Sequence, residues 1–189
     1  DIIRLWVASS DYTVDVRISK EILKQLSEAY RKIRNTARFI LGNLDGFDPN
    51  TDCVADDQLQ EIDRWALAAL DDLMVNTSAG YAVYDFNKVY HAVYNFCVVA
   101  MSNFYLDVTK DRLYCTNGAG RKAAQTTMYK ILVALDKIIA PILCFTSQEI
   151  WDFMPKTEGM NKYVVFEQMP KAGQYAADDA FKAKWAQLI

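Results

Sequence analysis

Apolar side chains recur at intervals of three and four residues over most of this 189-residue chain. Such spacing lines one face of an α-helix with apolar groups, and that face is stable only when another element covers it. The pattern predicts long helices over about 19–41, 57–76, 85–108 and 120–140. Because short loops join these helices, we expect an all-α fold in which they pack as an antiparallel bundle.

Residues with known positional preferences mark the expected helix ends. Ser19 and Asp85 are predicted N-caps, and Gly42 is predicted to stop the first long helix. Gly80 is expected at the break after the second long helix, and Pro141 at the end or a kink of the fourth.

The pattern beyond Pro141 predicts shorter elements. Thr146 and Glu149 have the spacing of a capping box, which indicates a short helix that stops before Pro155. A β-like run is expected over 163–166, followed by a last amphipathic helix marked by Phe181, Trp185 and Leu188.

We expect one bundle domain with a segment on either side. Residues 1–18 are predicted as a connector from a preceding domain. The apolar run over 2–7 in this connector is expected to pack on a part of the protein that lies N-terminal to the connector. The bundle is predicted over 19–155, and a small C-terminal extension with the start of a further helix over 156–189. The absence of an initiator Met and the helical pattern at the last residues indicate a piece of a larger protein.

The composition narrows the class of protein. An apolar share of 52% supports a core without a disulfide or metal staple. The four cysteines lack C-x-x-C spacing and His91 is the single histidine, so we expect reduced thiols and no metal or cofactor in this chain. Charged residues and a proline interrupt the longest apolar stretch, 131–145, and no signal peptide is visible, which predicts a cytoplasmic location without membrane contact.

The first long helix carries a row of cations on the side away from its apolar stripe. At 100° per residue the row contains Lys20, Lys24, Arg31, Arg34 and Arg38, with Asn35 at its edge. Over 19–44, six cations and two anions leave a local charge of +4, although the whole chain carries −3. Over 56–72, six acidic residues oppose one arginine, so the domain is expected to have a basic and an acidic side.

Such a row suits a phosphate backbone, because arginine presents a planar fork of donors to phosphate oxygens or to the edge of guanine. The candidate RNA-binding residues are Lys24, Arg31, Arg34, Asn35 and Arg38, with Asn35 supplying hydrogen bonds to bases. Second-tier candidates are Arg64, Arg112 and Trp65, whose ring could stack on an unpaired base. Two simpler interpretations stay open: a basic face that is only solvated, and a helical module that binds a protein partner through its sided charges.

No catalytic residue is predicted. A di-metal bundle needs paired E-x-x-H motifs, and Cys–His catalysis would depend on His91 alone. No glycine-rich phosphate loop follows a strand.

Several strings, in order, resemble the region that follows the catalytic domain in bacterial isoleucyl-tRNA synthetases, a class I family. The most specific is YRKIRNTARFILGNL over 30–44. The others are IIRLWVASSDYT (2–13), DRWAL (63–67), YDFNKV (84–89), SNFYLDVTKDRLY (102–114), QTTMYKIL (125–132) and APILCFTSQEIW (140–151).

The resemblance implies the anticodon-binding domain of a ligase that charges tRNA with isoleucine at the expense of ATP. The implied partners are the anticodon arm of isoleucine tRNA and the remaining domains of the parent enzyme. Sites for ATP-Mg and zinc are expected in those domains, because the HIGH and KMSKS strings and a cysteine-rich module are missing from this chain. The equivalent domain of a valine or other related class I synthetase remains the alternative within the same class.

Overall fold

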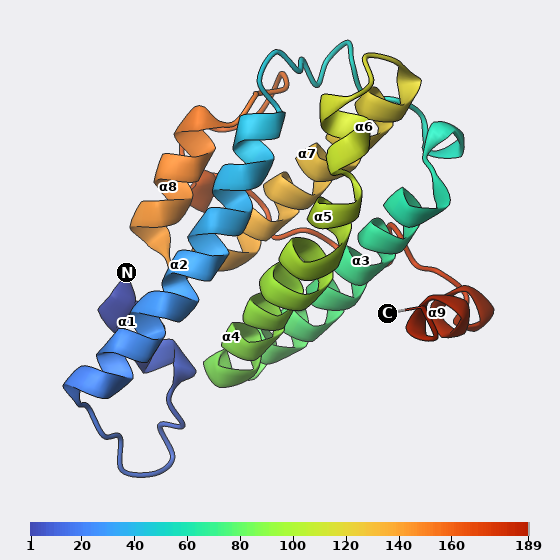
Figure 1. Ribbon diagram of the computed structural model, residues 1–189. Coiled ribbons are helices and arrows are strands. Elements are labelled where there is room, and N and C mark those ends of the chain that lie inside the picture. The colour runs from blue at the N-terminus through green and yellow to red at the C-terminus, as the bar shows by residue number, and fades with distance from the viewer. Residues whose placement is uncertain (189) are drawn as a thin grey trace.

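A computed structural model describes residues 1–188 as a bundle of helices without a strand among those residues (Figure 1). Successive long elements run in alternating directions. They are α2 (Lys20–Asn43), α3 (Glu61–Ala82), a rod made of α4 (Phe86–Asn95), η2 (Phe96–Tyr105), α5 (Leu106–Val108) and α6 (Lys110–Tyr114), and finally α7 (Ala119–Ile139). The prediction of an all-α antiparallel bundle is confirmed.

Shorter elements complete the fold. The helix α1 (Ile2–Ser9) precedes the bundle, α8 (Cys144–Phe153) follows α7, and α9 (Asp179–Ala186) comes last. Single 3₁₀ turns lie at η1 (Asp56–Gln58) and η3 (Val164–Phe166). The β-like run predicted over 163–166 is therefore wrong, because a 3₁₀ turn occupies it. No helix among residues 1–188 combines the length and apolarity needed to cross a bilayer.

Two predicted N-caps are confirmed and one predicted capping box is not. The Ser19 hydroxyl accepts a hydrogen bond from the backbone N of Ile22 at 3.2 Å, and the Asp85 carboxylate accepts one from Lys88 N at 3.0 Å. Each satisfies one backbone donor that the helix itself leaves free. Thr146 lies inside α8, whose N-cap is Leu143, so Thr146 and Glu149 do not form the predicted capping box.

The core surrounds α7, whose side chains at Met128, Ile131, Leu132, Leu135 and Ile138 are buried. This helix contacts α2, α3, α6 and α8. Burying one such side chain contributes roughly 1.5–3 kcal/mol, so α7 provides much of the apolar stabilisation.

The rod from α4 to α6 contains a wide π-helical segment, η2, where the sequence predicts one continuous α-helix. The buried hydroxyl of Thr36 on α2 lies 3.2 Å from the carbonyl oxygen of Cys97 and 3.0 Å from the Ser102 hydroxyl. The Thr36 hydroxyl of α2 is thus a hydrogen-bond partner for a backbone carbonyl group of the π-helical segment. This contact joins segments that are distant in the sequence, and the local pattern of apolar residues does not report it.

The segment before Ser19 is more than a connector. The side chains of Leu5 and Ala8 on α1 are buried, and α1 packs on α2 and α4. One face of the predicted apolar run therefore packs on the bundle. Ile3 and Val7, on the other face of α1, are exposed.

The C-terminal extension lies along α3 and accounts for part of its acidic face. The buried Asp71 carboxylate accepts hydrogen bonds from the backbone N of Gly173 at 2.8 Å and of Tyr175 at 3.2 Å. Lys182 pairs with Asp72, and Lys184 with Glu61, each at 2.6 Å. The acidic side predicted from the sequence is thus a docking face for the chain's own extension. Residue 189 lies outside the described residues.

Gly80 is buried inside α3, where the sequence predicts a break between helices. A Cβ at this position would lie 2.8 Å from Cγ2 of Val89 and 3.1 Å from the carbonyl oxygen of Asp85. The missing side chain therefore permits the close approach of α3 and α4. Gly42, also predicted to end a helix, lies within α2 and has no heavy atom within 4 Å of a built Cβ.

These two glycines should respond oppositely to the same substitution. Gly80→Ala is expected to lower the free energy of unfolding by about 1–3 kcal/mol, because the added methyl group collides with α4. Gly42→Ala should raise it by about 0.4–1 kcal/mol, because alanine restricts the unfolded chain. Urea unfolding followed by circular dichroism measures both. A neutral Gly80→Ala variant would show that α4 yields to the methyl group at little cost.

Candidate nucleic-acid interface

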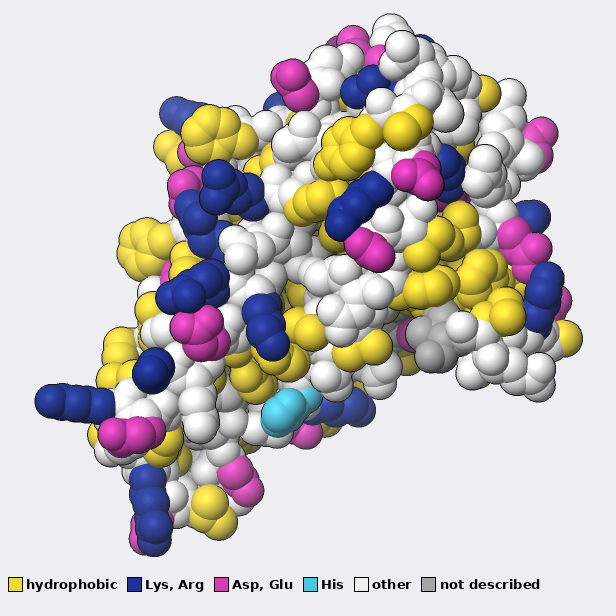
Figure 2. Space-filling view, in the orientation of Figure 1, with side chains coloured by type: hydrophobic (Ala, Val, Ile, Leu, Met, Phe, Trp, Pro, Cys, Tyr) yellow, Lys and Arg dark blue, Asp and Glu magenta, His cyan; other side chains and the backbone are white. Residues whose placement is uncertain are grey.

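The predicted row of cations forms a ridge along the solvent side of α2. The stripe of Leu26, Ala29, Ile33, Ala37 and Ile40 is buried, which turns the opposite side of the helix outward. Figure 2 shows Lys and Arg side chains following α2 from its first turn over much of its length, with acidic groups interspersed. We call the row of Lys20, Lys24, Arg31, Arg34 and Arg38 the basic ridge.

Carboxylates neutralise the ridge only in part. Arg31 pairs with Glu28 at 3.2 Å, and Arg34 pairs with Glu149 of α8 at 3.4 Å. All four side chains in these pairs are at least 40% exposed. Such exposed pairs contribute roughly 0.2–1 kcal/mol, so a phosphate could displace them at small cost. Within residues 1–188, Lys20, Lys24 and Arg38 form no ion pair.

Polar side chains flank the ridge. Asn35 is exposed, and its side-chain amide makes no hydrogen bond to another of the described residues. Lys32, on the flank facing α4, donates a hydrogen bond to the Tyr94 hydroxyl at 3.0 Å. The amide of Asn35 is therefore available to a base edge, whereas Lys32 is engaged with α4.

A groove of about 560 Å³ separates α2 from α8 beside the ridge. Arg34 and Arg38 line it from α2, and Ile150 and Phe153 line it from α8. Phe145 and Phe153, at the two ends of α8, are each 75% exposed. Phe153 lines the groove together with Arg34 and Arg38, and an exposed ring beside guanidinium groups is a surface on which an unpaired base can stack. Neither aromatic was predicted from the sequence as a site residue. The signal that could have found them is the inward placement of Ser147, Ile150 and Trp151 on a short helix, which turns the end residues outward.

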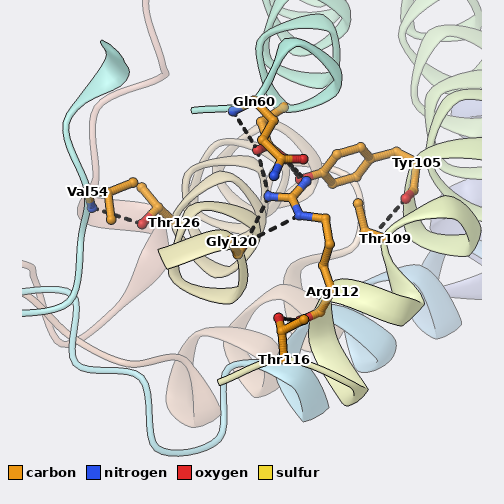
Figure 3. Close-up of polar contacts among 9 residues, drawn as sticks. Val54, Gln60, Tyr105, Thr109, Arg112, Thr116, Gly120 and Thr126 are labelled. Atoms are coloured by element: carbon orange, nitrogen blue, oxygen red, sulfur yellow. Dashed lines mark hydrogen bonds and ion pairs between the residues drawn. The ribbon is translucent and has the colours of Figure 1, made fainter. Parts of the chain in front are cut away.

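The structure gives Arg112 a different role from the predicted one. Its guanidinium group donates hydrogen bonds to both carboxylate oxygens of Asp63, at 2.9 and 2.8 Å, and to the carbonyl oxygen of Gly120 at 2.8 Å (Figure 3). The Tyr105 hydroxyl and the backbone N of Gln60 also donate to Asp63. Asp63 is fully buried and Arg112 is 16% exposed, so this arginine holds α3, α6 and α7 together and is not placed to bind RNA.

The other two second-tier candidates lie away from the ridge. The Trp65 ring is half-buried, with its centroid 4.9 Å from that of Phe104 and 5.7 Å from that of Trp185. It therefore packs inside the domain and is not free to stack on a base. Arg64 is exposed but lines a separate hollow between α3 and the extension, on the acidic side of the domain.

Residues 63–188 match the family described as "Anticodon-binding domain of tRNA ligase". The chain belongs to this family. The match covers two thirds of the chain, from the start of α3 onward. An anticodon-binding domain of a tRNA ligase agrees with the exposed basic ridge and with the all-helical fold.

Curated relatives extend the similarity over the ridge helix. The isoleucine--tRNA ligase of Syntrophotalea carbinolica is 56% identical over 180 residues, which cover 94% of this chain and 19% of the relative. The isoleucine--tRNA ligase of Caldicellulosiruptor saccharolyticus is 52% identical, covering 100% of this chain and 21% of the relative. The enzyme of Bacillus mycoides is 49% identical, covering 98% and 20%. This anticodon-binding domain thus spans about a fifth of the length of these relatives, and the resemblance to isoleucyl-tRNA synthetases is confirmed.

A solved structure shares the fold of the anticodon-binding domain. The LeuRS chain in the ternary complex of Agrobacterium radiobacter K84 agnB2 LeuRS with tRNA and LeuAMS superposes with a TM-score of 0.66 at 16% identity. The match covers 92% of this chain and 19% of that chain. At this identity the likeness concerns the helical architecture alone.

Proposed function

We propose that this domain binds the anticodon arm of isoleucine tRNA as part of an isoleucine--tRNA ligase. The observation that carries the proposal is the basic ridge, which is exposed and lies on a rigid helix that packs against the residues matching the anticodon-binding family. The names of the similar ligases support isoleucine as the amino acid.

The ridge is long enough to follow a nucleic-acid backbone. Lys24 and Arg38 are fourteen residues apart on α2, which corresponds to about 21 Å along the helix axis at 1.5 Å per residue. Lys24, Arg31, Arg34 and Arg38 would contact phosphates or base edges, and Asn35 would hydrogen-bond to a base. The groove beside Arg34 and Arg38 would accept an unpaired base against Phe153.

The domain's contribution to the reaction would be binding and orientation. Energy gained at the anticodon arm can position a distant acceptor end, which raises the rate of a reaction performed elsewhere. We place the ATP-Mg and zinc sites, and all bond-making steps, in the other parts of the parent enzyme. The cytoplasm, where tRNA is charged, is the compartment that this role requires.

The ridge can be tested with a labelled isoleucine-tRNA anticodon stem-loop. Arg31→Ala combined with Arg38→Ala is expected to weaken binding at least tenfold, because two phosphate contacts are lost. The slope of log K against log salt should become less steep by about one to two. Fluorescence anisotropy titrations at several salt concentrations measure both quantities.

Lys162→Ala with Lys171→Ala provides a matched control, because it removes the same charge from exposed positions on the C-terminal extension. Its binding and salt slope should stay close to those of the unmodified chain. A salt slope that is the same in the ridge variant and the unmodified chain would remove Arg31 and Arg38 from the interface. If the unmodified chain did not bind the stem-loop, that result would favour the interpretation as a protein-binding module.

A further inference from the structure

Two side chains, from Asp1 at the N-cap of α1 and from Arg4 within α1, hold the corner at which α7 passes into α8. The Asp1 carboxylate accepts hydrogen bonds from the backbone N of Thr146 at 2.8 Å and from its hydroxyl at 2.5 Å. The Arg4 guanidinium donates to the carbonyl oxygens of Ile142 and Pro141, each at 2.7 Å. We call Asp1 and Arg4 the corner clamp.

The charges of the corner clamp match the backbone groups that they contact: Arg4 meets carbonyl groups of the turn between α7 and α8, and Asp1 meets the N-terminal end of α8. The last carbonyl groups of a helix carry partial negative charge, and the first N–H groups carry partial positive charge. Arg4 faces carbonyl groups just after the end of α7, and Asp1 faces N–H groups in the first turn of α8. One turn of α1 therefore satisfies donors and acceptors that the α7–α8 corner leaves free.

Hydrogen bonds continue from the corner clamp to the ridge helix. The buried Thr146 hydroxyl, which donates to Asp1, also lies 2.9 Å from the hydroxyl of Tyr30 on α2. One turn further along α8, Glu149 pairs with Arg34 of the ridge. Both residues line the groove between α2 and α8. The placement of α8 by α1 thus determines where Glu149 meets Arg34.

We propose that Asp1 and Arg4 are positioning residues for RNA binding: Asp1 through Thr146, and Arg4 through the carbonyl groups of Pro141 and Ile142, fix the start of α8 against α2, and Glu149 then orients the guanidinium group of Arg34 in the groove. The inference rests on the proposed function of the ridge. Although α1 contributes no side chain to the ridge, its placement then affects RNA binding.

A double-mutant cycle between Asp1→Ala and Arg34→Ala tests this coupling with the same stem-loop. We expect Arg34→Ala to weaken binding about tenfold in the unmodified chain and about threefold in the Asp1→Ala background, because residues of one network couple while distant independent sites add. Arg31→Ala is the matched control, since its partner Glu28 lies on α2 itself. Its cost should be the same in both backgrounds.

The hydroxyl of Thr146 gives a second, milder variant. Thr146→Val removes the side-chain hydrogen bonds to Asp1 and Tyr30, although the backbone N of residue 146 can still donate to Asp1. It should therefore reduce the cost of Arg34→Ala in the same direction as Asp1→Ala, whereas Thr146→Ser should restore the full cost. This pair of variants carries the test if Asp1→Ala does not fold. Equal costs of Arg34→Ala in all backgrounds, in a chain that binds RNA, would overturn the role of the corner clamp and leave the proposed function intact. Failure of the unmodified chain to bind would remove both.

Discussion

Replacing Arg112 by Ala is expected to lower the free energy of unfolding by about 3–5 kcal/mol, among the largest effects of any single substitution in this domain. The substitution leaves the Asp63 carboxylate fully buried, with only the Tyr105 hydroxyl and the backbone N of Gln60 as donors. An unpaired charge in the interior costs far more than the loss of an exposed ion pair. Urea unfolding followed by circular dichroism measures the loss.

Lys110→Ala is the control from the same helix, because it breaks an exposed pair with Asp107 of nearly equal length, 2.7 Å. It should cost less than about 1 kcal/mol. Arg112→Lys keeps the charge but cannot donate parallel hydrogen bonds to both oxygens of Asp63. The free energy of unfolding of this variant should therefore lie between those of Arg112→Ala and the unmodified chain. If Arg112→Ala cost no more than Lys110→Ala, the buried pair would contribute little to the fold.

The inward orientation of the partly buried Arg112 could have been predicted from spacing. Tyr105, Thr109 and Leu113 are buried, and Arg112 lies seven residues after Tyr105, which places both on one helical face. Charge counting treats every arginine alike and misses this distinction. On α2, in contrast, the apolar stripe is continuous, so the opposite face is clearly defined and the ridge residues lie outward as predicted.

The features that the sequence did not predict depend on distant contacts. Glycine is a typical signal of a helix break, but Gly80 lies inside α3, where its missing side chain makes room for Val89 of α4. Thr146 has the local pattern of a capping residue, but its partners are Asp1 and Tyr30. Local periodicity therefore predicts which segments are helical and which face is basic, whereas the groove, the π-helical segment and the corner clamp emerge only when helices meet.

Asp136→Asn is expected to stabilise the domain at neutral pH, which is unusual for a substitution in a core. Asp136 is fully buried on α7, and neither carboxylate oxygen has a hydrogen-bond partner among the described residues. Burial raises the pKa of this carboxyl from 3.8 to about 8, although the Lys156 ammonium group favours its ionised form. The folded state therefore keeps a proton that the unfolded chain releases near pH 4.

The sign of the pH dependence follows from that difference. Between about pH 4 and pH 8 the folded state binds one more proton than the unfolded state, so its stability falls as pH rises. At about 1.4 kcal/mol for each pH unit, the loss between pH 4 and pH 7 is about 4 kcal/mol. Asparagine has nearly the shape of the protonated acid and does not titrate. Asp136→Asn should remove this slope and raise the free energy of unfolding at pH 7 by about 2–4 kcal/mol.

Asp71→Asn makes the same chemical change at a buried carboxylate that is fully engaged, with backbone N–H groups of Gly173 and Tyr175 as donors. It should lower the free energy of unfolding by about 1–3 kcal/mol, because charge-assisted hydrogen bonds are weakened. Urea unfolding at half-unit intervals from pH 4.5 to 8 compares both variants with the unmodified chain. A destabilised Asp136→Asn variant that keeps the original slope would mean that Asp136 is ionised in the fold and pairs with Lys156. Opposite signs for the two substitutions would show that the hydrogen-bond partners of a buried carboxylate, and not its burial alone, decide whether its charge stabilises this bundle.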